Sequence, residues 1–252
     1  MQMKKYIVVA VVFLTAAISA FGQKYHVTNV TRERILVDST FADDARGVEV
    51  LAPYKHIVDS IMSPVVGKVA KYMAAHNPES ELSNLLADIM VWQGRRYGEK
   101  PDLGIYNMGG IRAALPAGDV TFGDVNDVAP FENYITFISL TGGQMKTLFD
   151  QIAKSNGCGL SKGTALVIKG REVESVTLNG QPIDPNRTYR IVTLNYLAEG
   201  NDGFAVLPEG FDIKSPKDEQ ARTREFIVDY FIEKNKAGEV VDAEIEGRVV
   251  LK

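Results

Sequence analysis

The sequence has few of the residues that build cross-links, thiol nucleophiles or metal centres. Cys158 is the single cysteine among 252 residues, so the chain forms no internal disulfide. Its glycine neighbours and the lack of a flanking base argue against a catalytic thiol. The three histidines, His26, His56 and His76, lie far apart and outside any H-E-x-x-H spacing. We therefore expect no metal site and no cofactor in this chain.

The sequence also has no excess of basic residues and none of the common phosphate-binding or nucleophile motifs. Lys and Arg number 28 against 32 Asp and Glu, a net charge of -4, so no nucleic-acid partner is expected. Neither a G-x-x-x-x-G-K-[ST] loop nor a G-x-S-x-G turn occurs. Carboxylates are plentiful, but no pair is singled out for acid–base catalysis.

The one long apolar run lies at the N-terminus. Two lysines precede the uncharged residues 6–21, and the small side chains of Ala20 and Gly22 suit a cleavage site. This pattern predicts a signal peptide over 1–22, export to a periplasmic or extracellular location, and a single domain over 23–252. A retained membrane anchor is the alternative. It is disfavoured because the run is shorter than the ~20 residues of a spanning helix.

Hydrophobic periodicity predicts a chain that mixes helices with a partly antiparallel sheet. Ser80 and the Thr141/Gln144 pair are expected to cap two of the helices. An extended segment is expected over 26–37. Helices are expected over 54–62, 81–97, 141–157 and 219–235. Strands are expected over 103–107, 134–140, 164–169, 172–178, 188–195 and 244–251.

The first candidate binding stretch, IYNMGGIR, begins at Ile105. Two glycines, Gly109 and Gly110, follow a short apolar run, and glycine accepts the positive φ of a sharp turn. Asn107 offers a donor and an acceptor together, and Arg112 offers a planar cation suited to carboxylate or phosphate. Taken alone, the stretch is more typical of a glycine turn with a solvated arginine.

Two further stretches, VAPFENY and LNYLAEGNDGF, carry aromatic residues in polar surroundings. Phe131 is either part of the core or available for stacking, and the residues alone favour the core. Asp202 could accept hydrogen bonds from a vicinal diol, although Asn-Asp-Gly is also strong turn chemistry. Together with Tyr196, these residues indicate a nucleoside site, in which aromatic faces sandwich a base.

Five stretches, in this order, resemble the C-terminal, substrate-binding domain of the two-domain 5′-nucleotidases and UDP-sugar hydrolases. The resemblance implies an α+β fold of layered helices around mixed, partly antiparallel sheets. The stretches are SNLLADIM (83–90), YNMGGIRAAL (106–115), GDVTFGDVNDVAPFENYI (118–135), LTGGQMKTLFD (140–150) and TYRIVTLNYLAEGNDGF (188–204).

The resemblance also implies a role for each matching residue. The amide and the arginine of N-x-G-G-I-R contact base and ribose or phosphate, the two aromatics stack on the base, and the aspartate binds the ribose hydroxyls. The expected substrate-binding residues are Asn107, Gly109, Gly110, Arg112, Phe131, Asn133, Tyr196 and Asp202.

Some positions depart from the family pattern. Met108 and Asn201 each stand where the family has glycine, and Tyr196 stands where it usually has phenylalanine. An arginine that some members place just before the helix at 81–97 has no counterpart here, which puts phosphate affinity in doubt.

The resemblance does not include the family's N-terminal metallophosphatase domain, which holds two metals and the catalytic histidines. It therefore implies that this chain recognises a nucleoside or nucleotide for a separately encoded metallophosphatase subunit, as in a split 5′-nucleotidase. A stand-alone exported nucleoside-binding protein is the main alternative. An enzyme that acts alone through unidentified residues is a further one.

Overall fold

The computed structural model describes residues 26–38 and 40–252, so the signal peptide predicted over 1–22 lies outside the described residues. The chain divides into two units that meet between Val50 and Leu51, and each is described by itself. Residues 26–38 contain neither helix nor strand. The expectation of a single domain over 23–252 stays a prediction.

Helix α2 (Ala45–Met62) begins well before the predicted 54–62, and Pro53 lies inside it. None of its residues is buried, and apolar side chains along it, such as Leu51 and Tyr54, are exposed. Within the described ranges, no helix combines the length and apolar character that crossing a membrane requires.

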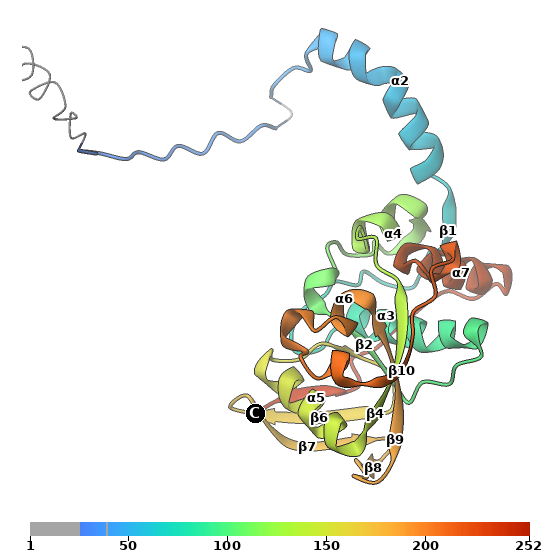
Figure 1. Cartoon of the computed structure of the whole chain (residues 1–252). Coiled ribbons are helices and arrows are strands. Elements are labelled where there is room, and N and C mark those ends of the chain that lie inside the picture. Colours follow the sequence, from blue (N-terminus) through green and yellow to red (C-terminus); the bar gives the residue numbers. More distant parts are fainter. Residues whose placement is uncertain (1–25, 39) are drawn as a thin grey trace, which may run out of the picture. The chain divides into compact units, whose positions relative to one another are not determined.

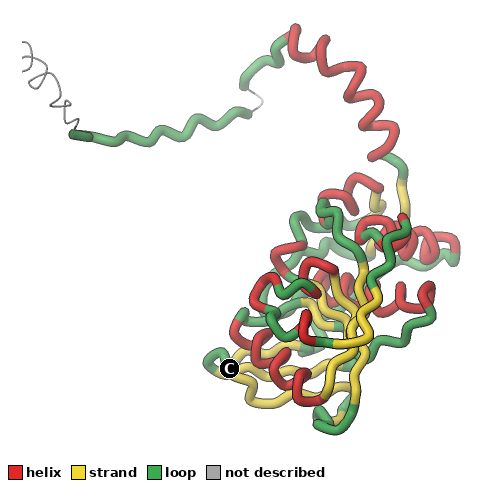
Figure 2. Tube along the Cα trace, viewed as in Figure 1, coloured by secondary structure: helices red, strands yellow, loops and turns green. Residues whose placement is uncertain are grey.

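Helices pack on mixed sheets in the second unit, as predicted for the fold class (Figures 1 and 2). The central sheet has the strand order β10-β4-β9-β2-β5, in which β2 and β9 are parallel and the other neighbours antiparallel. Its strands are β2 (Leu103–Tyr106), β4 (Ile135–Thr141), β5 (Gly159–Leu160), β9 (Thr188–Leu194) and β10 (Phe211–Lys214).

Two smaller sheets complete the strand framework. The pair β1 (Val65–Val69) and β3 (Gly118–Thr121) is antiparallel. A four-stranded sheet has the order β11-β6-β7-β8, in which the last strand of the chain pairs parallel with β6. Its strands are β6 (Thr164–Lys169), β7 (Glu172–Leu178), β8 (Gln181–Pro182) and β11 (Val249–Leu251).

Both faces of the central sheet are buried, because successive side chains of a strand point to opposite faces. On β4, Ile135 and Phe137 join one hydrophobic cluster, whereas Ile138 and Leu140 join the other. The first cluster also contains residues of α3 (Glu81–Gln93) and α7 (Thr223–Lys236), and the second contains residues of α5 (Gly142–Lys154). The central sheet is therefore a layer covered on each side.

The helices confirm the predicted apolar faces better than the predicted ends. The side chains of Leu82 and Met90 on α3 are buried as expected, and Ser80 caps its start. That helix ends at Gln93, and a 3-10 turn continues over 94–97. The Thr141/Gln144 capping box is present at the start of α5. Of the predicted strand over 244–251, only β11 is a strand, because the residues before it take part in a network of polar contacts.

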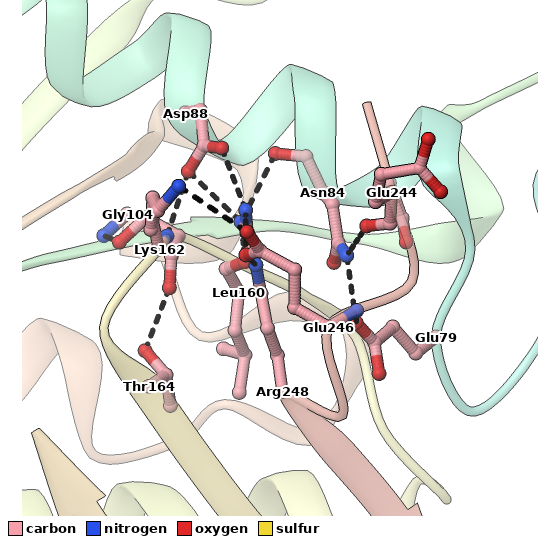
Figure 3. A network of polar contacts seen from close by, with 12 residues as sticks. Glu79, Asn84, Asp88, Gly104, Leu160, Lys162, Thr164, Glu244, Glu246 and Arg248 are labelled. Carbon is pink, nitrogen blue, oxygen red and sulfur yellow. Dashed lines mark hydrogen bonds and ion pairs between the residues drawn. The ribbon is translucent and has the colours of Figure 1, made fainter. Parts of the chain in front are cut away.

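This network fastens the end of the chain to α3 (Figure 3). Arg248 is 4% exposed and forms a paired contact with Asp88, with Nη1 2.9 Å from Oδ1 and Nη2 2.8 Å from Oδ2. It also donates to the carbonyl oxygen of Leu160 at 2.8 Å and to the carboxylate of Glu246 at 2.9 Å. A buried arginine is stable only with such partners.

Candidate functional site

The ends of three central strands meet at one edge of the sheet. Strands β2 and β9 are parallel, so their carboxyl ends lie together, and the antiparallel β4 begins at the same edge. Ligands commonly bind where parallel strands end in this way. A pocket of about 220 Å³ lies here, lined by Asn107, Gly109, Gly110, Phe131, Asn133, Tyr196 and Asp202.

Seven of the eight residues predicted from the sequence therefore line one pocket, although they come from three distant segments. Arg112 is the exception and lies outside the lining. Its guanidinium donates to the carbonyl oxygen of Gly109 at 3.3 Å, and its central carbon is 5.8 Å from the centroid of the Phe131 ring. The structure brings these residues together, and their roles in binding stay predictions.

Asn107 follows β2 directly and is 7% exposed. Its Nδ2 donates to Oδ2 of Asp202 at 2.8 Å, whereas its Oδ1 is buried and has no hydrogen-bond partner among the described residues. A buried amide oxygen without a hydrogen-bond partner is uncommon in folded proteins.

The two glycines after Asn107 serve a different purpose from the one predicted. Neither Gly109 nor Gly110 has a positive φ, so the expectation of a left-handed turn was wrong. A Cβ on Gly110 would lie 2.5 Å from Oδ1 of Asn107. Gly110 is thus required for the close approach of the Asn107 side chain, and Gly109 presents a bare backbone to the pocket.

Phe131 is 47% exposed, so the expectation from the residues alone, which placed it in the core, was wrong. It stands in the loop between α4 (Phe122–Val128) and β4, with one side on the pocket. Its position agrees with the stacking alternative. Tyr196 lines the same pocket from α6 (Asn195–Ala198), the short helix that follows β9.

The residues that hold the Phe131 loop were not among those predicted from the sequence. The side chain of Asn195 accepts a hydrogen bond from the Tyr134 amide at 2.7 Å. At the start of α7, Thr223 donates twice to the carbonyl oxygen of Asn133, from its amide at 2.9 Å and its hydroxyl at 3.1 Å.

Arg224 on the same helix donates to Glu132 at 2.8 Å and to Asn126 at 2.9 Å. Only the polar residue at the end of a predicted strand, Asn195, carried a signal in the sequence. The contacts from α7 are long-range and leave no local pattern.

The pocket brings together aromatic, amide and carboxylate side chains. Among the described residues that line it, Asp202 is the one carboxylate, and the two-metal sites that cleave phosphoesters need several ligands. The described part of the chain has no group of three His, Cys, Asp or Glu placed to hold a metal ion. These residues do not fit the metal pair that the resemblance places in the family's N-terminal domain. Burial raises the pKa of the Cys158 thiol, which disfavours the nucleophilic thiolate.

Comparison with known proteins gives consistent matches over most of the second unit. The family model for the 5′-nucleotidase C-terminal domain matches residues 65–209. Protein UshA of Yersinia enterocolitica is 30% identical over 180 residues, which cover 69% of this chain and 32% of that protein. The endonuclease YhcR of Bacillus subtilis is 31% identical over 193 residues, covering 73% and 15%. Cell wall protein Lmo0130 of Listeria monocytogenes is 27% identical over 195 residues, covering 71% and 24%.

Solved structures give the same result. A 5′-nucleotidase precursor from Thermus thermophilus superposes with a TM-score of 0.68 and 30% identity, over 81% of this chain and 42% of that one. The NAD nucleotidase of Haemophilus influenzae superposes with a TM-score of 0.60 and 22% identity, over 83% and 41%, and shares the fold. The chain spans about a third or less of the three curated relatives above and under half of these two structures.

Proposed function

Because the chain belongs to the 5′-nucleotidase C-terminal domain family, we propose that its pocket binds the nucleoside part of a nucleotide. One observation carries this proposal. Side chains that follow β2, precede β4 and follow β9 line a single pocket with two aromatic rings, two amides and one carboxylate. Such a set provides a stacking face together with hydrogen-bond donors and acceptors, which are what a base and a ribose require.

Each group has a role in this proposal. The rings of Phe131 and Tyr196 stack on the base, and stacking contributes roughly 1–3 kcal/mol per base. Asn107, which lines the pocket, offers its side-chain amide to the base or ribose. Asp202 accepts from ribose hydroxyls, and Arg112 at the rim offers its cation to a phosphate.

We further propose that a separately encoded metallophosphatase subunit acts with this chain in nucleotide catabolism. Its metals would supply the activated water, and binding energy from this chain would orient the phosphoester. Helix α2 supports a partner, because its exposed apolar residues recur at the spacing of a helix-packing stripe, Leu51, Tyr54, Val58 and Ile61. The match to Protein UshA covers 32% of that protein, so this chain corresponds to one part of it.

Export is part of the proposal. It rests on the signal-peptide pattern over 1–22 and on the printed name of one relative, a cell wall protein. A nucleotide-binding chain outside the cytoplasm would meet substrates released there or supplied from the surroundings.

The binding proposal is tested by calorimetric titration of the purified chain with adenosine, AMP and UDP-glucose in the absence of metal. We expect saturable binding, weakened roughly 5- to 150-fold by Phe131→Ala, which removes one stacking ring. Phe211→Ala is the matched control, because Phe211 is 46% exposed on β10 and does not line the pocket. No binding at millimolar ligand, or equal effects of the two variants, would refute the proposal.

The partner proposal is tested separately by AMP hydrolysis. We expect activity when the chain is mixed with a metallophosphatase subunit and a divalent metal, and loss of that activity with chelator. Hydrolysis by the chain alone that survives chelator would contradict it. Nucleoside binding with no activity in any mixture would favour the stand-alone binding protein.

A further inference from the structure

The carboxylate of Asp202 is held from two sides before any ligand is present. Tyr196 Oη donates to its Oδ1 at 2.9 Å, and Asn107 Nδ2 donates to its Oδ2 at 2.8 Å. The backbone of Asp202 adopts a left-handed conformation with φ 55°, between Gly200 at φ 90° and Gly203 at φ 85°. Such a conformation is uncommon for residues other than glycine, although aspartate adopts it more readily than most.

The loop that carries Asp202 is tied back to α6 by a second side chain. Asn201 Nδ2 donates to the backbone carbonyl oxygen of Tyr196 at 2.8 Å. Phe204, which ends the loop, is 2% exposed and anchors it in the core. Tyr196 therefore holds the Asp202 side chain, and Asn201 holds the loop that carries Asp202.

The hydrogen bonds leave a defined set of open acceptors. A carboxylate oxygen has two lone pairs, and each oxygen of Asp202 uses one in the contacts described above. One acceptor therefore remains on each oxygen, and Asp202 lines the pocket. Two acceptors on one carboxylate match two donors on adjacent carbons, which is the arrangement of a vicinal diol.

We propose that Tyr196 and Asn201 are positioning residues that orient Asp202 for a vicinal diol, so that the pocket selects ribose over deoxyribose. This inference rests on the proposed nucleoside site and adds a basis for sugar selectivity. Tyr196 then has two separable functions. Its ring stacks on the base, and its hydroxyl acts through Asp202 on the sugar.

Tyr196→Phe separates these functions because it keeps the ring and removes the hydroxyl. Binding is measured by calorimetry with adenosine and with 2′,3′-dideoxyadenosine, which lacks both hydroxyls. We expect the variant to weaken adenosine roughly three- to tenfold, the range of about one hydrogen bond. The dideoxy ligand should change by less than about twofold, because stacking is retained. Asn201→Gly should also reduce the preference for adenosine over the dideoxy ligand.

Tyr97→Phe is the matched control. Tyr97 Oη donates to Oδ1 of Asp218 at 3.0 Å, a tyrosine–aspartate contact that does not line the pocket. Its loss should leave both ligands unaffected. Equal weakening of both ligands by Tyr196→Phe, or no change in either, would overturn the inference while the nucleoside site stands. A wild-type chain that binds neither ligand would overturn the proposed function and this inference together.

A second measurement tests the contact without any ligand. The hydrogen bond to Asp202 raises the pKa of Tyr196 above its ordinary value. In NMR titration of ring-labelled tyrosine, with Tyr196→Phe identifying the resonance, Asp202→Asn should lower this pKa. An unchanged pKa in Asp202→Asn would show that the contact is not formed in solution, and the inference would fail.

Discussion

Replacing Arg248 with methionine removes the cation that fastens the end of the chain to α3, while keeping a side chain of similar length. The variant loses the paired contact with Asp88, the bond to the Leu160 carbonyl oxygen and the contact with Glu246. Breaking a buried ion pair by removing one partner costs about 3–5 kcal/mol. The side chain of Asp88 is 36% exposed and regains water, which lowers the cost.

We therefore expect Arg248→Met to reduce the free energy of unfolding by about 3 kcal/mol. For a folded unit of about 200 residues, this loss of stability corresponds to a fall in Tm of roughly 6–12 °C. Urea denaturation and thermal melts measure both quantities. Asp88→Asn should also destabilise, since it leaves the guanidinium buried with Glu246 as its remaining carboxylate partner.

The two changes should not add, because each removes the same contact. In a double-mutant cycle with Arg248→Met and Asp88→Asn, we expect a coupling of about 1.5 kcal/mol or more. The control is Lys252→Met, which breaks an ion pair with Glu174 whose side chains are 56% and 37% exposed. It should cost less than about 1 kcal/mol. Equal losses for Arg248→Met and the control, or strict additivity in the cycle, would refute the reasoning.

Two further predictions concern stability. A hydrogen bond from Arg190 holds the pKa of the Glu99 carboxyl below its ordinary value, so its stabilisation is present above the unfolded pKa and is lost as pH falls. Glu99→Gln should flatten the dependence of the unfolding free energy on pH between roughly pH 5 and 3, and an unchanged slope in urea denaturation would contradict this. A Cβ on Gly142 would lie 2.0 Å from the carbonyl oxygen of Asp184, so Gly142→Ala should cost about 2 kcal/mol or more. In the same assay Gly143→Ala, whose nearest contact is 3.8 Å away, should be close to neutral.

Local patterns in the sequence were enough to predict many of the helices and strands. The apolar spacing of α3 and α5 and their capping residues identified both helices and their buried faces. The hairpin of β6 and β7 was also predictable, because its strands are consecutive and joined by a short turn. Short strands such as β5 and β10 were missed, since two to four residues carry too little periodicity.

The residues of the site could be predicted from the sequence, but their arrangement in space could not. The resemblance named the residues, but no pattern in the short apolar runs of β2 and β9 indicated that these strands pair in parallel. That pairing brings Asn107 and Tyr196 to one edge. Phe131 shows the same limit, since an isolated aromatic after proline is compatible with either burial or exposure.

The region after the family match is part of what holds the pocket. The match ends at residue 209, yet Thr223 and Arg224 of α7 hold the loop that carries Phe131. The last strand, β11, is itself held by Arg248. These contacts join segments about 90 to 160 residues apart, so they form only when the whole body folds. The loop around Phe131 depends on α7, which lies beyond the family's shared sequence.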